Sequence, residues 1–391
     1  MMKIYEIGTG YTPIPATMGA ATEIVVEELV KSFQKLDADI SLIDIQTQQR
    51  IPNTLPLIEV PVPSQFTGTD VQLGLLHKLK RVVYSLSLAR TLRSLLKKSS
   101  GKVILHFHNQ YNMYFFRKLV SKKLRSKAQI AYTVHSYIWA GEWADIHSTI
   151  QKRYFQEIDC VQHADHVLVL NEKTAAHFTQ HLGVPLDKIK QITNGVNTNG
   201  YHPLTSEDKA QCRSALKLEG KKVIFQVGSI CDRKNQLGAV QMLKDYLKDH
   251  PDVVYMYAGG VIDTEYQAQI QSYANENNIA SQVCYVGELC PGEELNRYYN
   301  TATVSIFPSK LESFGLVIIE ALSAGIPVLI ADKPLFDLAS GYFVYESPED
   351  CIRQLDHLLA APPDCNTVRQ EAVAHYSWDK IASDHLNIWN A

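Results

Sequence analysis

Short apolar runs alternate with longer amphipathic stretches along almost the whole chain. Apolar runs bounded by turn residues are typical of buried parallel strands, and apolar residues three or four positions apart are typical of helices. On this basis we predict strands at Lys3–Ile7, Asp39–Ile45, Leu57–Val60, Lys102–Phe107, Gln129–Val134, His166–Leu170, Ile189–Ile192, Lys222–Val227, Val253–Ala258, Val283–Val286, Thr303–Phe307 and Val328–Ala331. Because helices are predicted between them, the pattern indicates an α/β fold built on doubly wound parallel sheets.

The alternation is interrupted by a stretch of turn residues at 194–200, which is followed by Pro203. We place the domain boundary there, which gives a first domain over residues 1–198 and a second over residues 199–376. After Asp332 the pattern becomes irregular, and the chain ends in an amphipathic helix expected over residues 377–391. The sequence therefore predicts two domains of similar architecture and one final helix.

Length and cysteine usage narrow the class of protein. A chain of 391 residues is long enough for two α/β domains with full cores. The seven cysteines are scattered and odd in number, and no C-x-x-C pair occurs, which argues for a reducing compartment and against a disulfide framework or zinc ribbon. No run of about 20 apolar residues is present, and Met1 leads directly into a predicted strand. We therefore expect a cytoplasmic protein without a signal peptide.

The charged residues are unevenly distributed along the chain. Residues 1–198 carry 23 Lys and Arg against 16 Asp and Glu, whereas the remainder carries 15 against 25. Residues 71–141 contain 14 Lys and Arg and no acidic residue, and such a field attracts anions. Three interpretations stay open for this basic span: solvated helix faces, peripheral contact with an anionic membrane at its inner face, and binding of an anionic soluble acceptor. Nucleic acid is disfavoured, because the net charge is negative and no recognition motif accompanies the span.

Two glutamates mark the segment between the strands predicted at Thr303–Phe307 and Val328–Ala331. Glu312 lies in the loop after the first of these strands, and Glu320 lies in the apolar helix that follows. A carboxylate among apolar residues is costly unless a partner satisfies it. Because α/β sheets bind ligands at the carboxyl ends of their strands, we predict that both glutamates hold a ligand.

A second candidate site follows the strand predicted at Lys222–Val227. Gly228 ends this strand, and the adjacent cations Arg233 and Lys234 precede a predicted helix. A glycine, two cations and a helix N-terminus are typical of an anion site, although a solvated loop with surface cations is an equally good interpretation. The segment is not a Walker P-loop, because it lacks Gly-Lys-Ser/Thr.

Three histidines, His106, His108 and His135, end two strands of the first predicted sheet. Lone histidines are more often structural than functional. Metal ligation is disfavoured, because no carboxylate or cysteine accompanies them at ligand spacing along the chain. We therefore expect no metal site.

Taken in chain order, these segments resemble the retaining nucleotide-sugar glycosyltransferases with the GT-B fold, of the family-four type (glycosyl transferases group 1). The most specific segment is Pro308–Leu316 with Glu320, followed by Gly325-Ile326-Pro327-Val328. Further segments that resemble the family lie at 18–23, 105–108, 132–135, 164–171, 194–197, 286–289 and 376–378. The resemblance implies two Rossmann-like domains that face a cleft, with the first on the acceptor side and the second binding the donor. It also implies a C-terminal helix that crosses back to the first domain.

The resemblance also implies roles for individual residues. It places Arg233 and Lys234 at the donor diphosphate, Glu320 at the ribose, and Glu312 and His135 at the donor sugar. The catalytic set is then His135, Glu312, Lys234 and Arg233. The donor-binding set is Gly19, Arg233, Lys234, Gly287, Leu289, Ser313, Phe314, Gly315, Leu316 and Glu320. Ser229 departs from the family, which usually has arginine there, and so does the segment at 333–337, which leaves the choice of sugar open.

The activity implied is transfer of a hexosyl or N-acetylhexosaminyl group from a UDP-sugar, with UDP-N-acetylglucosamine and UDP-glucose as the leading donors. The acceptor would be a hydroxyl group of a glycan, a lipid-linked intermediate or a small metabolite. The transfer would be retaining and would need neither a metal nor another cofactor. Two alternatives stay open: a non-catalytic scaffold of the same fold, and a sugar-nucleotide epimerase.

Overall fold

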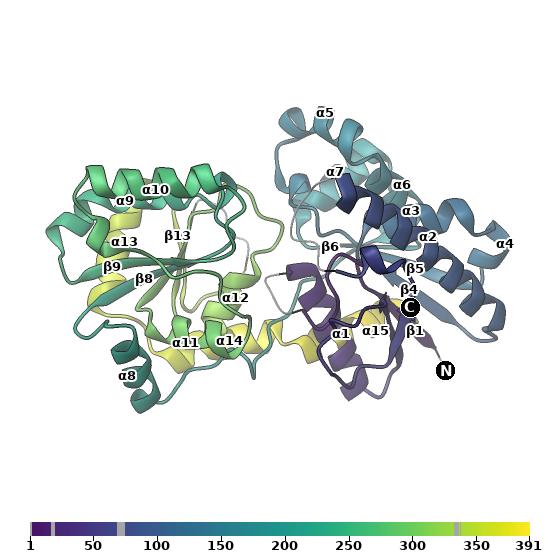
Figure 1. Ribbon diagram of the computed structural model, residues 1–391, viewed down its shortest axis with the longest axis horizontal. Coiled ribbons are helices and arrows are strands. Elements are labelled where there is room, and N and C mark those ends of the chain that lie inside the picture. The colour runs from purple at the N-terminus through teal and green to yellow at the C-terminus, as the bar shows by residue number, and fades with distance from the viewer. Residues whose placement is uncertain (1, 17–19, 69–74, 332–335, 337) are drawn as a thin grey trace. The chain divides into compact units, whose positions relative to one another are not determined.

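The computed structural model describes residues 2–16, 20–68, 75–331, 336 and 338–391. The chain forms two compact units (Figure 1). The first unit combines Met1–Ala16 and Ala20–Asn194 with Trp378–Ala391, and the second contains Gly195–Ser377.

A seven-stranded parallel sheet forms the centre of the first unit, in the order β3-β2-β1-β4-β5-β6-β7. Its strands are β1 (Lys3–Ile7), β2 (Asp39–Ile45), β3 (Leu57–Val60), β4 (Val103–Phe107), β5 (Ala128–Thr133), β6 (His166–Val169) and β7 (Ile189–Gln191). The helices of this unit are α1 (Ala21–Lys35), α2 (Leu75–Lys98), α3 (Gln110–Leu119), α4 (Lys122–Arg125), α5 (Trp143–Arg153), α6 (Phe155–His163), α7 (Glu172–Leu182) and α15 (Trp378–Asn390).

A six-stranded parallel sheet forms the centre of the second unit, in the order β10-β9-β8-β11-β12-β13. Its strands are β8 (Lys222–Val227), β9 (Val253–Ala258), β10 (Val283–Tyr285), β11 (Val304–Phe307), β12 (Val328–Ala331) and β13 (Tyr342–Tyr345). Its helices are α8 (Ser206–Ala215), α9 (Gln236–Asp249), α10 (Thr264–Glu276), α11 (Glu293–Thr301), α12 (Leu316–Ser323), α13 (Pro348–Ala360) and α14 (Cys365–Tyr376). The prediction of two doubly wound parallel sheets is thus confirmed.

Three elements of the second unit are absent from the sequence prediction: α8, β13 and α14. Helix α8 buries none of its residues, so it has no apolar periodicity to detect. Strand β13 lies at the edge of the sheet, and three of its four residues are only partly buried. Residues 71–74 of the basic span lie outside the described residues.

The final helix α15 packs in the first unit, as predicted. Trp389 is fully buried, and its ring centroid lies 5.3 Å from that of Phe33 in α1. Asp379 accepts hydrogen bonds from Ser32 and Lys35 at the other end of the contact. Burial of large aromatic groups is the main source of such packing energy. Among the residues that the structure describes, no helix combines the length and apolar character needed to cross a membrane.

Candidate functional site

The two loops singled out in the second domain lie side by side, because the strands that lead into them are neighbours. Strands β8 and β11 pair in parallel, so their carboxyl ends meet at one edge of the sheet. The backbone nitrogen of Lys310 donates to the carbonyl of Arg233 at 2.9 Å. The side chain of Asn235 donates to the carbonyl of Pro308 at 3.2 Å. These bonds hold the two loops together.

Glu312 forms ion pairs with both cations of the neighbouring loop. Its Oε1 lies 2.5 Å from Nη1 of Arg233 and 2.7 Å from Nζ of Lys234. The side chains of Glu312 and Lys234 are each only 11% exposed. Burial lowers the pKa of Lys234, and the neighbouring Glu312 carboxylate counteracts this shift. The structure thus brings together three residues of the expected catalytic set.

Buried amide side chains hold the backbone around these cations. Gln226 donates from Nε2 to the carbonyl of Lys234 at 2.8 Å. Gln236 donates from Nε2 to the carbonyl of Ser229 at 3.0 Å and to that of Gly228 at 3.3 Å. Both glutamines are almost fully buried. A fixed loop keeps its cations in place before a ligand binds, which is a requirement for electrostatic preorganisation.

The loop after β11 ends at Gly315, which caps helix α12. Gly315 has a φ of +88°, a left-handed conformation that favours glycine. Its neighbour Phe314 is buried against Phe336, with ring centroids 4.9 Å apart. Ser313 and Leu316 are partly buried on either side of this turn. The first amides of α12 therefore lie at the same sheet edge as Lys234, where unpaired helix N–H groups favour an anion.

Glu320 lies inside α12 and is 8% exposed. The hydroxyl of Tyr299 lies 3.3 Å from its Oε2, and Tyr201 supplies another hydrogen bond. Burial raises the pKa of Glu320 to about 7, although both tyrosines and the charge of Lys234 act in the opposite direction. The two tyrosines are the partners that a buried carboxylate requires, and nothing in their spacing along the sequence identified them.

Gly287 and Leu289 follow β10 at the same edge of the sheet. Gly287 has a φ of +92°, and its carbonyl accepts from the backbone nitrogen of Gly259 at 2.9 Å. A Cβ atom at Gly287 would meet no described heavy atom within 4 Å. The backbone there is consequently open to a ligand group.

His135 belongs to the first unit and forms part of a buried network there. Glu6 accepts from Nδ1 of His106 and from Nε2 of His108, both at 2.8 Å. Nδ1 of His108 lies 3.0 Å from Nε2 of His135, and Nε2 of His106 lies 2.7 Å from Oγ1 of Thr133. Burial opposes ionisation of Glu6, but the two histidines outweigh it and lower its pKa to about 2.

The sequence analysis missed Glu6, since it lies about a hundred positions before the histidines. Strands β1 and β4 pair with Glu6 directly opposite His106, so tertiary structure supplies the missing carboxylate. Ligand-type atoms of Glu6, His106 and His108 lie within 4.8 Å of one another, close enough for a metal ion. Both contacts to Glu6 have hydrogen-bond length. The ring nitrogens that face away from Glu6, which are Nε2 of His106 and Nδ1 of His108, also have hydrogen-bond partners. We therefore interpret the cluster as a hydrogen-bond network.

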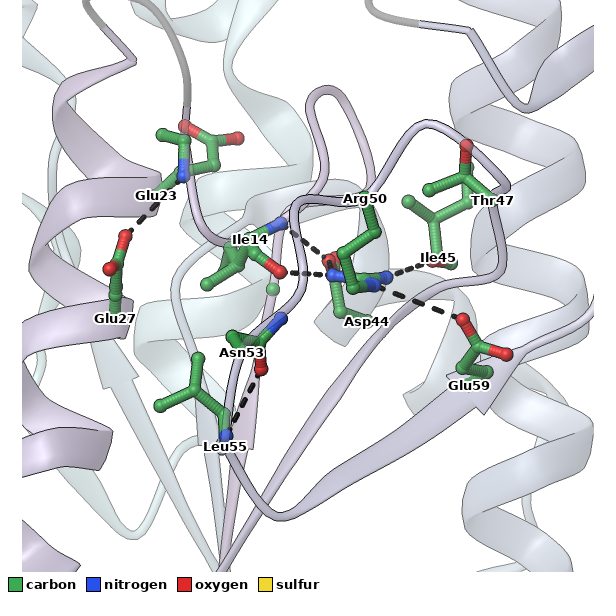
Figure 2. A network of polar contacts seen from close by, with 12 residues as sticks. Ile14, Glu23, Glu27, Asp44, Ile45, Thr47, Arg50, Asn53, Leu55 and Glu59 are labelled. Atoms are coloured by element: carbon green, nitrogen blue, oxygen red, sulfur yellow. Dashed lines mark hydrogen bonds and ion pairs between the residues drawn. The ribbon is translucent and has the colours of Figure 1, made fainter.

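A separate polar network fixes the loop after β1 (Figure 2). Asp44 accepts from the backbone nitrogen of Ile14 at 2.9 Å and from Arg50 at 2.8 Å. Arg50 also donates to the carbonyl of Ile14 and lies 3.8 Å from Glu59. Nearby Glu23 is buried, which raises its pKa to about 7, and accepts a hydrogen bond from Thr9. Gly19, expected at the donor, lies outside the described residues.

Comparisons with known proteins agree with this architecture. The family model "Glycosyltransferase Family 4" matches residues 22–199, and the model "Glycosyl transferases group 1" matches residues 208–374. The structure of Anabaena Alr3699/HepE in complex with UDP and glucose superimposes with a TM-score of 0.70 at 14% identity, over 100% of both chains. Together with the two parallel sheets, this likeness and others identify the GT-B fold.

Two curated relatives illustrate the range of the family. The D-inositol 3-phosphate glycosyltransferase of Acidothermus cellulolyticus is 30% identical over 254 residues, which is 61% of this chain and 56% of the relative. Spore coat protein SA of Bacillus subtilis is 21% identical over 248 residues, which is 59% of this chain and 66% of the relative. The match thus spans between about half and two thirds of the length of these relatives. With both of its domains matched by family models, the chain belongs to the glycosyltransferases of group 1, with a first domain of the family-4 type.

Proposed function

We propose that this protein is a retaining glycosyltransferase that moves a hexosyl or N-acetylhexosaminyl group from a UDP-sugar to a hydroxyl acceptor. The observation that carries this proposal is the cluster of Arg233, Lys234 and Glu312, with Glu320 in the adjoining helix. UDP as the nucleotide is supported by the complexes of Anabaena Alr3699/HepE with UDP, with UDP-glucose, and with UDP and glucose. UDP-glucose and UDP-N-acetylglucosamine are the leading candidates for the donor.

The cluster suits a reaction in which negative charge grows on a leaving diphosphate. In the structure, Glu312 holds both cations. We propose that the diphosphate takes this place, that Arg233 and Lys234 then stabilise it, and that Glu312 turns to hydroxyl groups of the sugar. Protein charges that are already in place where an anion develops usually make the largest single contribution to catalysis. Two cations and the N-terminal amides of α12 would supply it without a metal.

Glu320 would bind the ribose of the nucleotide. An ionised carboxylate can accept hydrogen bonds from both hydroxyls of a diol. Tyr201 and Tyr299 already donate to Glu320, which keeps its carboxyl group oriented. A ligand that supplies further donors favours the ionised form, so binding of the donor would lower the pKa of Glu320.

The test is a screen of UDP-, GDP- and ADP-sugars for nucleotide release and transfer, measured by mass spectrometry on the full chain. With the active donor, Lys234→Ala should lose at least about 100-fold in turnover, as is typical when a group that stabilises developing charge is removed. Glu320→Ala should lose transfer because the ribose is no longer held. Lys310→Ala is the matched control, because Lys310 lies in the same loop pair but is 51% exposed and bound to Asp232. Wild-type turnover in both site variants would overturn the proposal.

A non-catalytic scaffold is the second candidate, and the likeness to spore coat protein SA favours it. The two candidates differ in one respect: a transferase binds a nucleotide sugar and then turns it over, whereas a scaffold does not. No thermal stabilisation of the protein by any nucleotide or nucleotide sugar would support the scaffold. Appearance of a new UDP-sugar without an acceptor would instead identify an epimerase.

We also propose that the basic span makes peripheral contact with an anionic membrane. Its helix α2 exposes Leu76 and Leu79, which are 73% and 50% exposed and lie one helical turn apart. Lys78 lies between them, and Lys97 and Lys98 end the helix. The exposed leucines offer apolar contact with lipid, and the lysines beside them attract anionic headgroups. A protein held at the membrane surface in this way would reach an acceptor that is carried by a lipid.

A further inference from the structure

The buried network of the first unit has two branches that both start at Glu6. One branch runs through His106 to Thr133 at 2.7 Å, and within the described part of the chain it ends there, inside the core. The other runs through His108 to His135, and His135 is only partly buried. The ring centroids of His108 and His135 lie 5.3 Å apart, and the two facing nitrogens are at hydrogen-bond distance. The second branch therefore connects a buried carboxylate to a side chain that a ligand can reach.

The order of donors and acceptors along this branch follows from the carboxylate. Glu6 is ionised and can only accept, so the nitrogen of His108 that faces it, Nε2, carries a proton. Burial lowers the pKa of His108 to about 4 and that of His135 well below its usual value, so both rings are neutral near pH 7. Nδ1 of His108 is then a bare acceptor, and Nε2 of His135 donates to it.

We infer that Glu6 and His108 are positioning residues that hold His135 in the tautomer protonated at Nε2, so that its Nδ1 accepts a hydrogen bond from a hydroxyl group of the glycosyl donor. Among the described residues, no hydrogen-bond partner is found at this Nδ1. The inference rests on the proposed function only for the identity of the ligand. The tautomer itself is a property of the folded chain.

A purely structural role explains the network less well. An apolar core of equal volume would avoid the cost of burying a carboxylate, which is large unless every lone pair is satisfied. His385 of α15 offers a comparison inside the same core. Its ring centroid lies 5.5 Å from that of His106, whereas its Nδ1 bonds to the carbonyl of Ile381 in its own helix. It packs beside the network without joining it.

The direct test is nitrogen-15 NMR of the histidine side chains in the full-length protein, with His135→Gln used to assign the His135 signals. We expect a neutral His135 near pH 7, with Nε2 protonated and Nδ1 bare. An Nδ1-protonated His135, an imidazolium, or a spectrum that shows metal bound to His108 would overturn the inference. This measurement needs neither substrate nor activity, so its outcome is independent of the proposed function.

Variants connect the tautomer to function. Glu6→Gln presents an amide that can accept or donate a hydrogen bond to His108. The hydrogen bonds along the branch then have no preferred direction, and His135 should become a mixture of tautomers. Its kcat for donor hydrolysis without acceptor should fall about 10-fold or more, with little change in KM. His385→Gln is the matched control and should leave both the His135 signals and kcat unchanged.

The arms of the experiment separate the possible failures. If the spectrum has the expected tautomer but the wild-type protein turns over no sugar nucleotide, the proposed function fails. The positioning of His135 by Glu6 and His108 then still stands. If Glu6→Gln changes the tautomer and slows only transfer to an acceptor, leaving donor hydrolysis intact, the hydroxyl belongs to the acceptor and the assignment to the donor is overturned. If Glu6→Gln unfolds, the wild-type spectrum still decides the tautomer.

Discussion

Glu312 and Glu320 lie within one loop-and-helix segment, yet their surroundings give them different properties. Glu312 is neutralised by two cations at 2.5 and 2.7 Å, so its charge is already compensated. Among the described residues, the direct partners of the Glu320 side chain are tyrosine hydroxyls, and burial raises its pKa to about 7. An anionic ligand competes with Glu312 for its partners, whereas Glu320 gains partners from a ligand that donates hydrogen bonds.

The raised pKa of Glu320 predicts a pH dependence of stability. Folding favours its protonated form, so this contribution is fully present below the ordinary pKa of 4.5 and is lost as the pH rises through about 7. Glu320→Gln keeps the side chain neutral at every pH. Relative to wild type, the variant should therefore gain up to roughly 3 kcal/mol of unfolding free energy between pH 5 and pH 8.

Urea unfolding at both pH values measures this difference. Glu293→Gln on α11 is the control, because Glu293 is 82% exposed, and this variant should keep the pH dependence of the wild type. Glu23, which is also buried with a raised pKa, is present in all three proteins and cancels from the comparison. A constant difference between Glu320→Gln and wild type would contradict the prediction.

At the scale of elements, the final helix has the clearest energetic role. Trp389 is fully buried and packs on Phe33 of α1, with its ring centroid 5.4 Å from that of His106. Trp389→Ala removes this contact and leaves a cavity, which should cost about 3–5 kcal/mol of unfolding free energy. The urea midpoint of the full-length protein measures it. Asn387→Ala, at an exposed position of the same helix, should shift the midpoint little.

Elements also divide into those that the sequence reveals and those that it does not. Strands β1, β2, β3, β8, β9 and β12 have the predicted bounds, because each is a compact apolar run bounded by polar or turn residues. Helix α8 and strand β13 have no comparable pattern, since α8 lies exposed and β13 forms a sheet edge. The periodicity of apolar residues along the sequence reflects burial, so it does not detect an element that buries few of its residues.

At the scale of the whole molecule, the basic span and the exposed leucines of α2 predict binding to anionic lipid. Vesicles that contain anionic lipid should bind the protein more tightly than neutral vesicles, and added salt should weaken the binding because it screens the charges. Leu76→Ser should reduce binding by removing apolar contact with the lipid. Sedimentation with vesicles measures all three effects.

The control for Leu76→Ser is Leu186→Ser. Both leucines are 73% exposed, but Leu186 lies between α7 and β7, outside the basic span. Loss of lipid binding in Leu186→Ser as well would show that the effect is not specific to α2. Equal binding of the wild type to neutral and anionic vesicles would overturn the electrostatic part of the proposal.

Local pattern in the sequence determined the alternation of strands and helices, the two parallel sheets, and the family to which the loops at Arg233 and Glu312 belong. These features depend on residues that are close together in the sequence. Tertiary structure decided which side chains satisfy the buried charges: Tyr201 and Tyr299 for Glu320, and Glu6 for the histidines. Strand order and register bring these partners together across long separations, and a one-dimensional pattern carries no record of which strands become neighbours.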